Sequence, residues 1–174
     1  MDARTEEEGS GTGPVEVEVG VAPMRRWAGI GALSLIGLLL LWLALAHPPA
    51  SLGLRAGVLA GAVAALWLAV RMRLATERGL VLTGMELRES GPEGRLLARM
   101  DQVRGVDRGA FAFKPSHGFL LHLEPGAAGG RAWAPGLWWR VGSRVGVGGV
   151  LRASETRFLA EAIALRVGTA GRAA

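Results

Sequence analysis

One apolar stretch, residues 27–70, constrains this chain more than any other part of its sequence. Its first part, WAGIGALSLIGLLLLWLALA at residues 27–46, has 20 residues without a charged side chain. At about 1.5 Å rise per residue, such a helix crosses the roughly 30 Å hydrocarbon core of a bilayer. The second part, LGLRAGVLAGAVAALWLAV at residues 52–70, carries one charge, Arg55, near enough to its start to reach the interface. The sequence therefore predicts two membrane-spanning helices.

The connector HPPAS makes these helices an antiparallel hairpin, because proline lacks an amide donor and restricts the residue before it. The connector has no basic residue other than its histidine, whereas arginines flank the outer ends of both helices: Arg25, Arg26, Arg71, Arg73 and Arg78. By the positive-inside rule, both termini are expected in the cytoplasm.

The alternative is a cleaved export signal, with Arg25 and Arg26 as its basic region and residues 44–46 as its cleavage site, especially if translation begins at Met24. The apolar run exceeds the usual roughly 7–15 residues of such a signal, and a second span follows at once. These two observations favour the hairpin.

Small residues recur at every fourth position of the second predicted helix: Gly53, Gly57, Gly61, Ala65 and Ala69. Such a stripe lets another helix backbone approach closely, and Gly57 and Gly61 form a GxxxG pair. The partner is either the chain's own first helix or a second copy of the chain, which would make a homo-oligomer.

Before the hairpin, residues 1–23 form an acidic, glycine-rich leader. This leader is expected to be disordered, because it has too little apolar surface to offset its ordering entropy. Its segment VEVEVGV alternates with the period of a strand and offers the alternative of strand addition to a sheet edge. We divide the chain into this leader, a hairpin at 24–74, one domain at 75–168 and a tail at 169–174.

Charge and cysteine content exclude several functions. The chain has a net charge of +5, and the leader's six acidic residues against Arg4 give it −5, so the rest is about +10. A basic domain is attracted to an anionic membrane surface. No nucleic-acid partner is expected, because the arginines are scattered and no recognised motif appears. The absence of cysteine excludes disulfides and thiolate chemistry.

Short alternating segments separated by turns follow Gly79 and predict an antiparallel meander of strands. Alternation places Phe111 and Phe113 on one face with Val103. A helix from Ser154 then closes the domain with an apolar stripe made of Phe158, Leu159, Ala162 and Ile163. The predicted fold class is α+β, a curved antiparallel sheet or partly open barrel capped by a C-terminal helix.

The stretches VDRGAFAFKPSHGFLL, APGLWWRVGSRVGVGG and SETRFLAEAI look like those of a group of alphaproteobacterial proteins. Together with the order of elements, residues 78–167 resemble bacterial pleckstrin-homology-like (PH-like) membrane proteins. The resemblance implies a bacterial inner membrane and a non-enzymatic platform for protein or lipid contacts. It does not extend to a phosphoinositide pocket: Arg88, Arg95 and Arg99 are present, but the dense lysine cluster is absent.

No enzyme activity or cofactor is expected from the residue pattern. His117 and His122 have no acidic or thiol co-ligand nearby in the sequence, and Ser143 lacks the preceding glycine of a nucleophile elbow. The glycines at 146, 148 and 149 lack the spacing of a phosphate-binding loop, so a bulge or close sheet packing is the better explanation. The two spans contain no acidic residue for a transport relay.

One constellation is a candidate contact with the membrane or a partner: Trp138, Trp139, Arg140 and Arg144, with Trp133 as a further member. Tryptophan favours the headgroup region, and arginine binds phosphates or carboxylates. The alternative is that the tryptophans belong to the core. The sequence thus predicts a membrane-anchored scaffold for protein partners or, alternatively, a module that binds anionic lipid.

Overall fold

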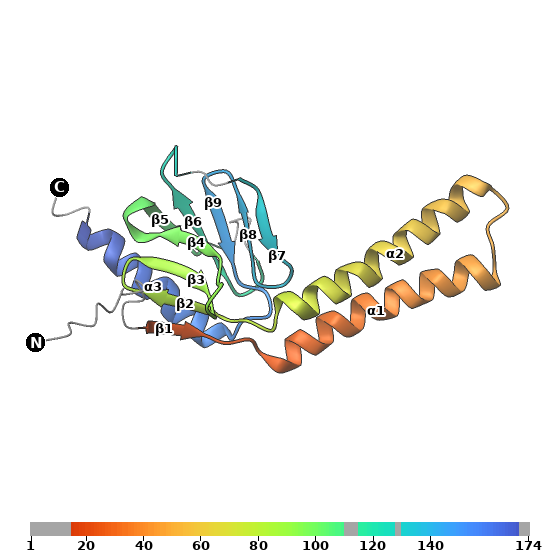
Figure 1. The fold of residues 1–174 in the computed structure, drawn as a ribbon, viewed down its shortest axis with the longest axis horizontal. Coiled ribbons are helices and arrows are strands. Elements are labelled where there is room, and N and C mark those ends of the chain that lie inside the picture. The colour runs from red at the N-terminus through yellow and green to blue at the C-terminus, as the bar shows by residue number, and fades with distance from the viewer. Residues whose placement is uncertain (1–14, 110–114, 128–129, 171–174) are drawn as a thin grey trace, which may run out of the picture.

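The computed structural model describes residues 15–109, 115–127 and 130–170 (Figure 1). After a first strand, two long helices precede the remaining strands of two antiparallel sheets and a C-terminal helix, which confirms the predicted α+β class. The elements are β1 (Val15–Val19), α1 (Pro23–Ala46), α2 (Leu52–Ala75), β2 (Leu80–Thr83), β3 (Glu86–Glu89), β4 (Leu96–Arg99), η1 (Met100–Gln102), β5 (Val103–Asp107), β6 (Phe119–Leu123), β7 (Ala132–Ala134), β8 (Trp138–Val141), β9 (Arg144–Val147) and α3 (Ala153–Ala170).

The predicted helical pair α1–α2 projects from the rest of the molecule as a hairpin (Figure 1). Each helix has 24 residues and is therefore longer than the apolar stretch from which it is predicted. Proline in the first turn starts α1, where its missing amide is no loss. Ser51 caps α2, since its hydroxyl accepts a hydrogen bond from the Leu54 amide at 3.2 Å.

Two separate sheets replace the single curved sheet or partly open barrel that the sequence predicts. The four-stranded sheet has the order β1-β2-β3-β4, and the five-stranded sheet has the order β5-β6-β9-β8-β7. The 3-10 turn η1 interrupts the chain between β4 and β5, so those strands belong to different sheets and no closed barrel forms. Large side chains of both sheets are fully buried in one core: Leu80, Leu82, Leu87, Leu97, Phe119, Leu121 and Val145.

The prediction that the whole leader is disordered is wrong for residues 15–19. Residues 15–19 form β1, which pairs antiparallel with β2, as the strand alternative proposed. Val17 and Val19 point into the core, whereas Glu18 between them is exposed. The alternating valines are stabilised as a strand because β2, brought back by the hairpin, offers a partner edge. Residues 1–14 lie outside the described part of the chain.

The closing helix α3 packs against β1, β5 and η1. Leu159 and Ile163 are fully buried as predicted, but Phe158 is 59% exposed and does not belong to the apolar stripe. Ala160 is buried instead, so the buried face is rotated away from Phe158. The predicted positions of Phe111 and Phe113 lie outside the described residues.

Candidate functional site at the base of the hairpin

The hairpin is inserted between two paired strands of the domain. β1 leads into α1, β2 follows α2, and Val19 of β1 lies opposite Leu80 of β2. Both helices therefore start from neighbouring points on one sheet, and the domain holds the hairpin through two covalent connections side by side (Figure 1).

Backbone hydrogen bonds fix the segment between β1 and α1 to the start of α3. The Ala22 amide donates to the Val150 carbonyl at 2.8 Å, and the Arg152 amide donates to the Gly20 carbonyl at 3.0 Å. The Gly20 amide donates to Oε2 of Glu155 at 2.7 Å. This bond, together with nearby Arg152, holds the pKa of Glu155 below its ordinary value of 4.5.

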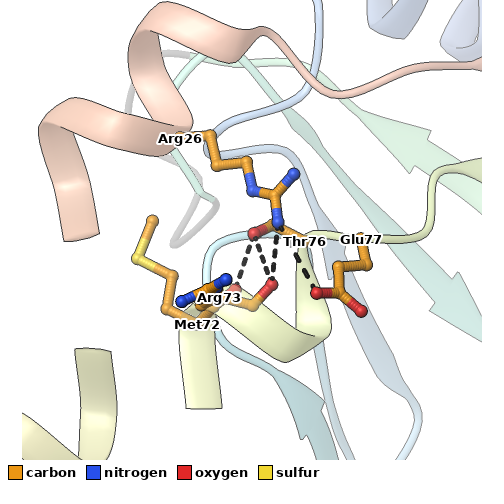
Figure 2. Close-up of polar contacts among 5 residues, drawn as sticks. All are labelled: Arg26, Met72, Arg73, Thr76 and Glu77. Carbon is orange, nitrogen blue, oxygen red and sulfur yellow. Dashed lines mark hydrogen bonds and ion pairs between the residues drawn. The ribbon is translucent and has the colours of Figure 1, made fainter. Parts of the chain in front are cut away.

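A second group of contacts joins the two helices at the same level (Figure 2). Nη2 of Arg26 on α1 donates to the Arg73 carbonyl at 3.2 Å and lies 4.0 Å from Oε1 of Glu77. The Thr76 hydroxyl, which is buried, donates to the Met72 carbonyl at 2.6 Å. The Arg73 carbonyl near the end of α2 thus accepts from both Arg26 and the Thr76 hydroxyl, each at 3.2 Å, whereas the Met72 carbonyl also accepts the Thr76 amide at 3.0 Å. We call these contacts, with the Gly20–Glu155 bond, the junction.

Beyond the junction the hairpin exposes large apolar side chains along its length. Leu35, Leu38, Leu39, Trp42 and Trp67 are all more than half exposed. Only 17% of the apolar window of α1 and 11% of that of α2 are buried, whereas a core helix of a soluble protein is mostly buried. By length, composition and exposure, both helices of this α+β protein are candidate membrane spans.

The predicted contact residues at 138–144 do not share one surface. They lie on β8 and β9, where successive side chains point to opposite faces of the sheet. Trp138 is 3% exposed, and its indole donates to Oε1 of Glu89 at 2.9 Å, so it is a core residue and the contact prediction is wrong for it. Arg140 is partly buried and donates to the Leu97 carbonyl of β4 at 3.4 Å, linking the two sheets.

The other members of this constellation lie on the outer face of the five-stranded sheet. Trp139 pairs in register with the 43% exposed Trp133 on β7, and Arg144 is exposed. The Trp139 indole covers Gly146: a Cβ added there would lie 2.5 Å from the ring. Close packing of the sheet therefore accounts for this glycine, as expected from the sequence. The alternation of a strand along residues 138–141 is the sequence pattern that assigns these side chains to the two opposite faces of the sheet.

The small-residue stripe of α2 faces α1 only in part. Positions for a Cβ at Gly53 and Gly57 have no atom within 4 Å, and one at Gly61 would lie 3.5 Å from Leu40. The hairpin instead packs closely at Gly37 of α1, where a Cβ would lie 2.7 Å from Leu66. Ala65 is partly buried, and the residues of α2 that are buried are Ala62, Ala69 and Met72.

A polar cavity of about 300 Å³ lies beside the junction. Arg71 and Arg78 line it from the end of α2 and the turn that follows, Arg95 lines it from the β3–β4 connection, and Trp133 lines it from β7. Glu89 contributes a buried carboxylate, whose Oε2 lies 3.6 Å from Nε of Arg95. The sequence did not point to this cavity, because its arginines are far apart in the chain.

The two histidines of the domain lie on different elements. His117 lies in a turn with a positive φ of 58°, and His122 lies on β6 opposite Arg144. Among the residues that the structure describes, no group of three His, Asp or Glu side chains could hold a metal ion. The arginines considered for a phosphoinositide pocket each pair with a carboxylate: Arg88 with Glu86, Arg95 with Glu89 and Arg99 with Asp101.

Comparison of the chain with protein-family models, with curated proteins and with solved structures gives no match.

Proposed function

We propose that this protein is a membrane-anchored, non-enzymatic scaffold that presents a PH-like domain to protein partners at the cytoplasmic surface of a bacterial inner membrane. The junction is the observation that carries the proposal. A flexible linker would let the domain tumble, whereas the paired strands β1 and β2 and the Gly20–Glu155 bond fix its orientation to the hairpin. A surface held at a fixed angle to the membrane suits the assembly of partners.

The proposed orientation rests on the arginines at the domain end of the hairpin. Arg25, Arg26, Arg71 and Arg73 all lie at that end, and the connector at the other end has neither lysine nor arginine. The positive-inside rule then places the domain and both termini in the cytoplasm. The test is a reporter enzyme that is active only in the periplasm, fused after Ala174. Activity of this fusion would contradict the proposed orientation.

The PH-like assignment is part of the proposal. It is supported by the resemblance of residues 78–167 and by two antiparallel sheets that pack around one core with a C-terminal helix against them. The resemblance also supplies the expectation of contacts rather than chemistry.

Affinity purification of the full-length protein from its native membranes in mild detergent, with quantitative mass spectrometry, tests the scaffold. The matched control carries two short glycine–serine insertions, one after Gly20 and one after Arg78, which keep the anchor but loosen both connections to the domain. We expect a stoichiometric partner with the native chain and a several-fold lower recovery with the insertions. Recovery of the protein without any partner would refute the scaffold.

A second candidate function is an anionic-lipid-binding module. The cavity lined by Arg71, Arg78 and Arg95 favours it, because it lies at the end of a candidate membrane span. A second copy of the chain is a further candidate partner, through the open side of α2 at Gly53 and Gly57.

A further inference from the structure

The arginine cavity beside the junction has an excess of positive charge. Arg71, Arg78 and Arg95 line it together with Glu77 and Glu89, which gives a net charge of +1. Within the described ranges, the ion pairs engage both glutamates but neither Arg71 nor Arg78. The two arginines thus offer forked N–H donors at the edge of a hollow, the arrangement that binds a phosphate oxygen.

Aromatic side chains hold two of these arginines. The Arg71 guanidinium lies over the Trp67 ring, 5.5 Å from its centroid, and that of Arg95 lies over Trp138 at 5.6 Å. Stacking restricts the side chains without using their in-plane donors. Binding of an anion therefore costs less side-chain conformational entropy at Arg71 and Arg95 than at an arginine without such a stacking partner.

An apolar groove of about 440 Å³ lies next to this cavity. Leu33 of α1, Leu68 and Met72 of α2, and Trp139 of β8 line the groove. The cavity and the groove share Trp133, Ala134 and Pro135 at the edge of the five-stranded sheet. Leu68 precedes Arg71 by one helical turn, about 4.5 Å further from the domain end of α2. Met72 of the groove lies level with Arg71, so the two hollows overlap along α2, and the groove extends beyond the cavity toward the membrane interior.

We propose that the cavity and the groove together bind one anionic phospholipid, with its phosphate at Arg71, Arg78 and Arg95 and one acyl chain in the groove. The order of charge and apolar surface along α2 matches the order of headgroup and chain in a leaflet. A peptide in the groove would bring amide groups against mainly apolar side chains, which is unfavourable without partners. The proposal rests on the membrane insertion of the hairpin and is independent of the scaffold role.

The test is native mass spectrometry of the full-length protein, released from bilayers of phosphatidylglycerol and phosphatidylcholine with identical chains. We expect one phosphatidylglycerol to be retained preferentially by the native chain. The double variant Arg71→Gln, Arg78→Gln should lower this retention by about 25-fold, since each arginine near an anionic surface contributes on the order of a fivefold preference. The control variant Arg73→Gln, Arg144→Gln removes the same charge outside the cavity and should change retention by less than about twofold. Equal losses in both variants would mean diffuse attraction and would overturn the site.

Competition separates a lipid site from a site for a free anion. Inorganic phosphate and glycerophosphoglycerol, the headgroup without chains, should fail to displace phosphatidylglycerol at equal concentration, and Leu68→Phe, which fills the groove, should weaken retention without altering the arginines. Displacement by the headgroup alone would overturn the acyl-chain half of the proposal. Carbonate extraction of the same membranes reports insertion: an inserted protein without lipid preference refutes this site alone, whereas an extracted protein refutes the membrane anchor as well.

Discussion

The hairpin and the domain bury opposite kinds of side chains. In the domain the fully buried residues include the largest ones, such as Phe119, Leu97 and Leu121. In the hairpin several of the buried residues are small, among them Gly37 and Ala62, while leucines and tryptophans face outward. Water drives large apolar groups inward, whereas lipid is as apolar as leucine and leaves close backbone packing to hold helices together. The contrast is the one expected of a domain in water joined to a hairpin in lipid.

The largest expected effect comes from the domain core. Leu121→Ala removes a fully buried side chain and should lower the free energy of unfolding by about 2–5 kcal/mol. The matched change Leu39→Ala, at a 59% exposed position of α1, should change it by less than about 0.5 kcal/mol. Hydrogen exchange of the β6 amides in a lipid nanodisc measures both. Similar losses of protection in the two variants would contradict the contrast.

An introduced carboxylate tests whether the hairpin and the domain have different surroundings. Leu38 near the middle of α1 and Met85 in the β2–β3 turn are each 56% exposed. Leu38→Asp should disfavour insertion by about 2.5–3.5 kcal/mol, because a carboxylate enters hydrocarbon, whereas Met85→Asp meets water and should be nearly neutral. The fraction of protein that resists carbonate extraction reports the difference. Full insertion of Leu38→Asp would show that α1 does not span the bilayer.

Added volume tests which side of the hairpin is packed. Gly37→Val collides with Leu66 and should destabilise the helix pair by about 1–3 kcal/mol. Gly57→Val meets open space within one chain and should have little effect. Thermal unfolding in detergent, followed by tryptophan fluorescence, measures both, and cross-linking reports oligomers. A loss of oligomers specific to Gly57→Val would identify a second copy as the partner of the small-residue stripe.

The smallest effect concerns the junction that connects the two regions. Because the folded-state pKa of Glu155 is lowered, its contribution to stability is present above the ordinary value of 4.5 and is lost as the pH falls through the folded-state pKa. Glu155→Gln should therefore be less stable than the native chain at pH 7, by less than about 1 kcal/mol, and this difference should shrink on acidification. Denaturant titrations at several pH values measure it. A difference that stays constant with pH would exclude the charge as its cause.

Several features follow from local sequence. The uncharged stretch at 27–46 and the prolines of the connector determine the hairpin, since helix length and proline geometry need no distant partner. Turn residues and alternation determine most strands, and the apolar spacing identifies Leu159 and Ile163 on the buried face of α3 but wrongly adds Phe158. For the predicted contact residues, local sequence gives only part of the answer. The period of two places Trp138 and Trp139 on opposite faces of the sheet, but it does not show which face is buried.

Tertiary structure decided the features that depend on residues far apart in the chain. Strand β1 exists because β2, which follows it after the whole hairpin, supplies a paired edge. Trp138 packs into the core, where Glu89 from the other sheet satisfies its indole N–H. The arginines of the cavity meet only when α2 ends against the β3–β4 connection. A sequence pattern reports the preferences of neighbouring residues, whereas pairing, burial and shared cavities depend on which distant surfaces the folded chain brings together.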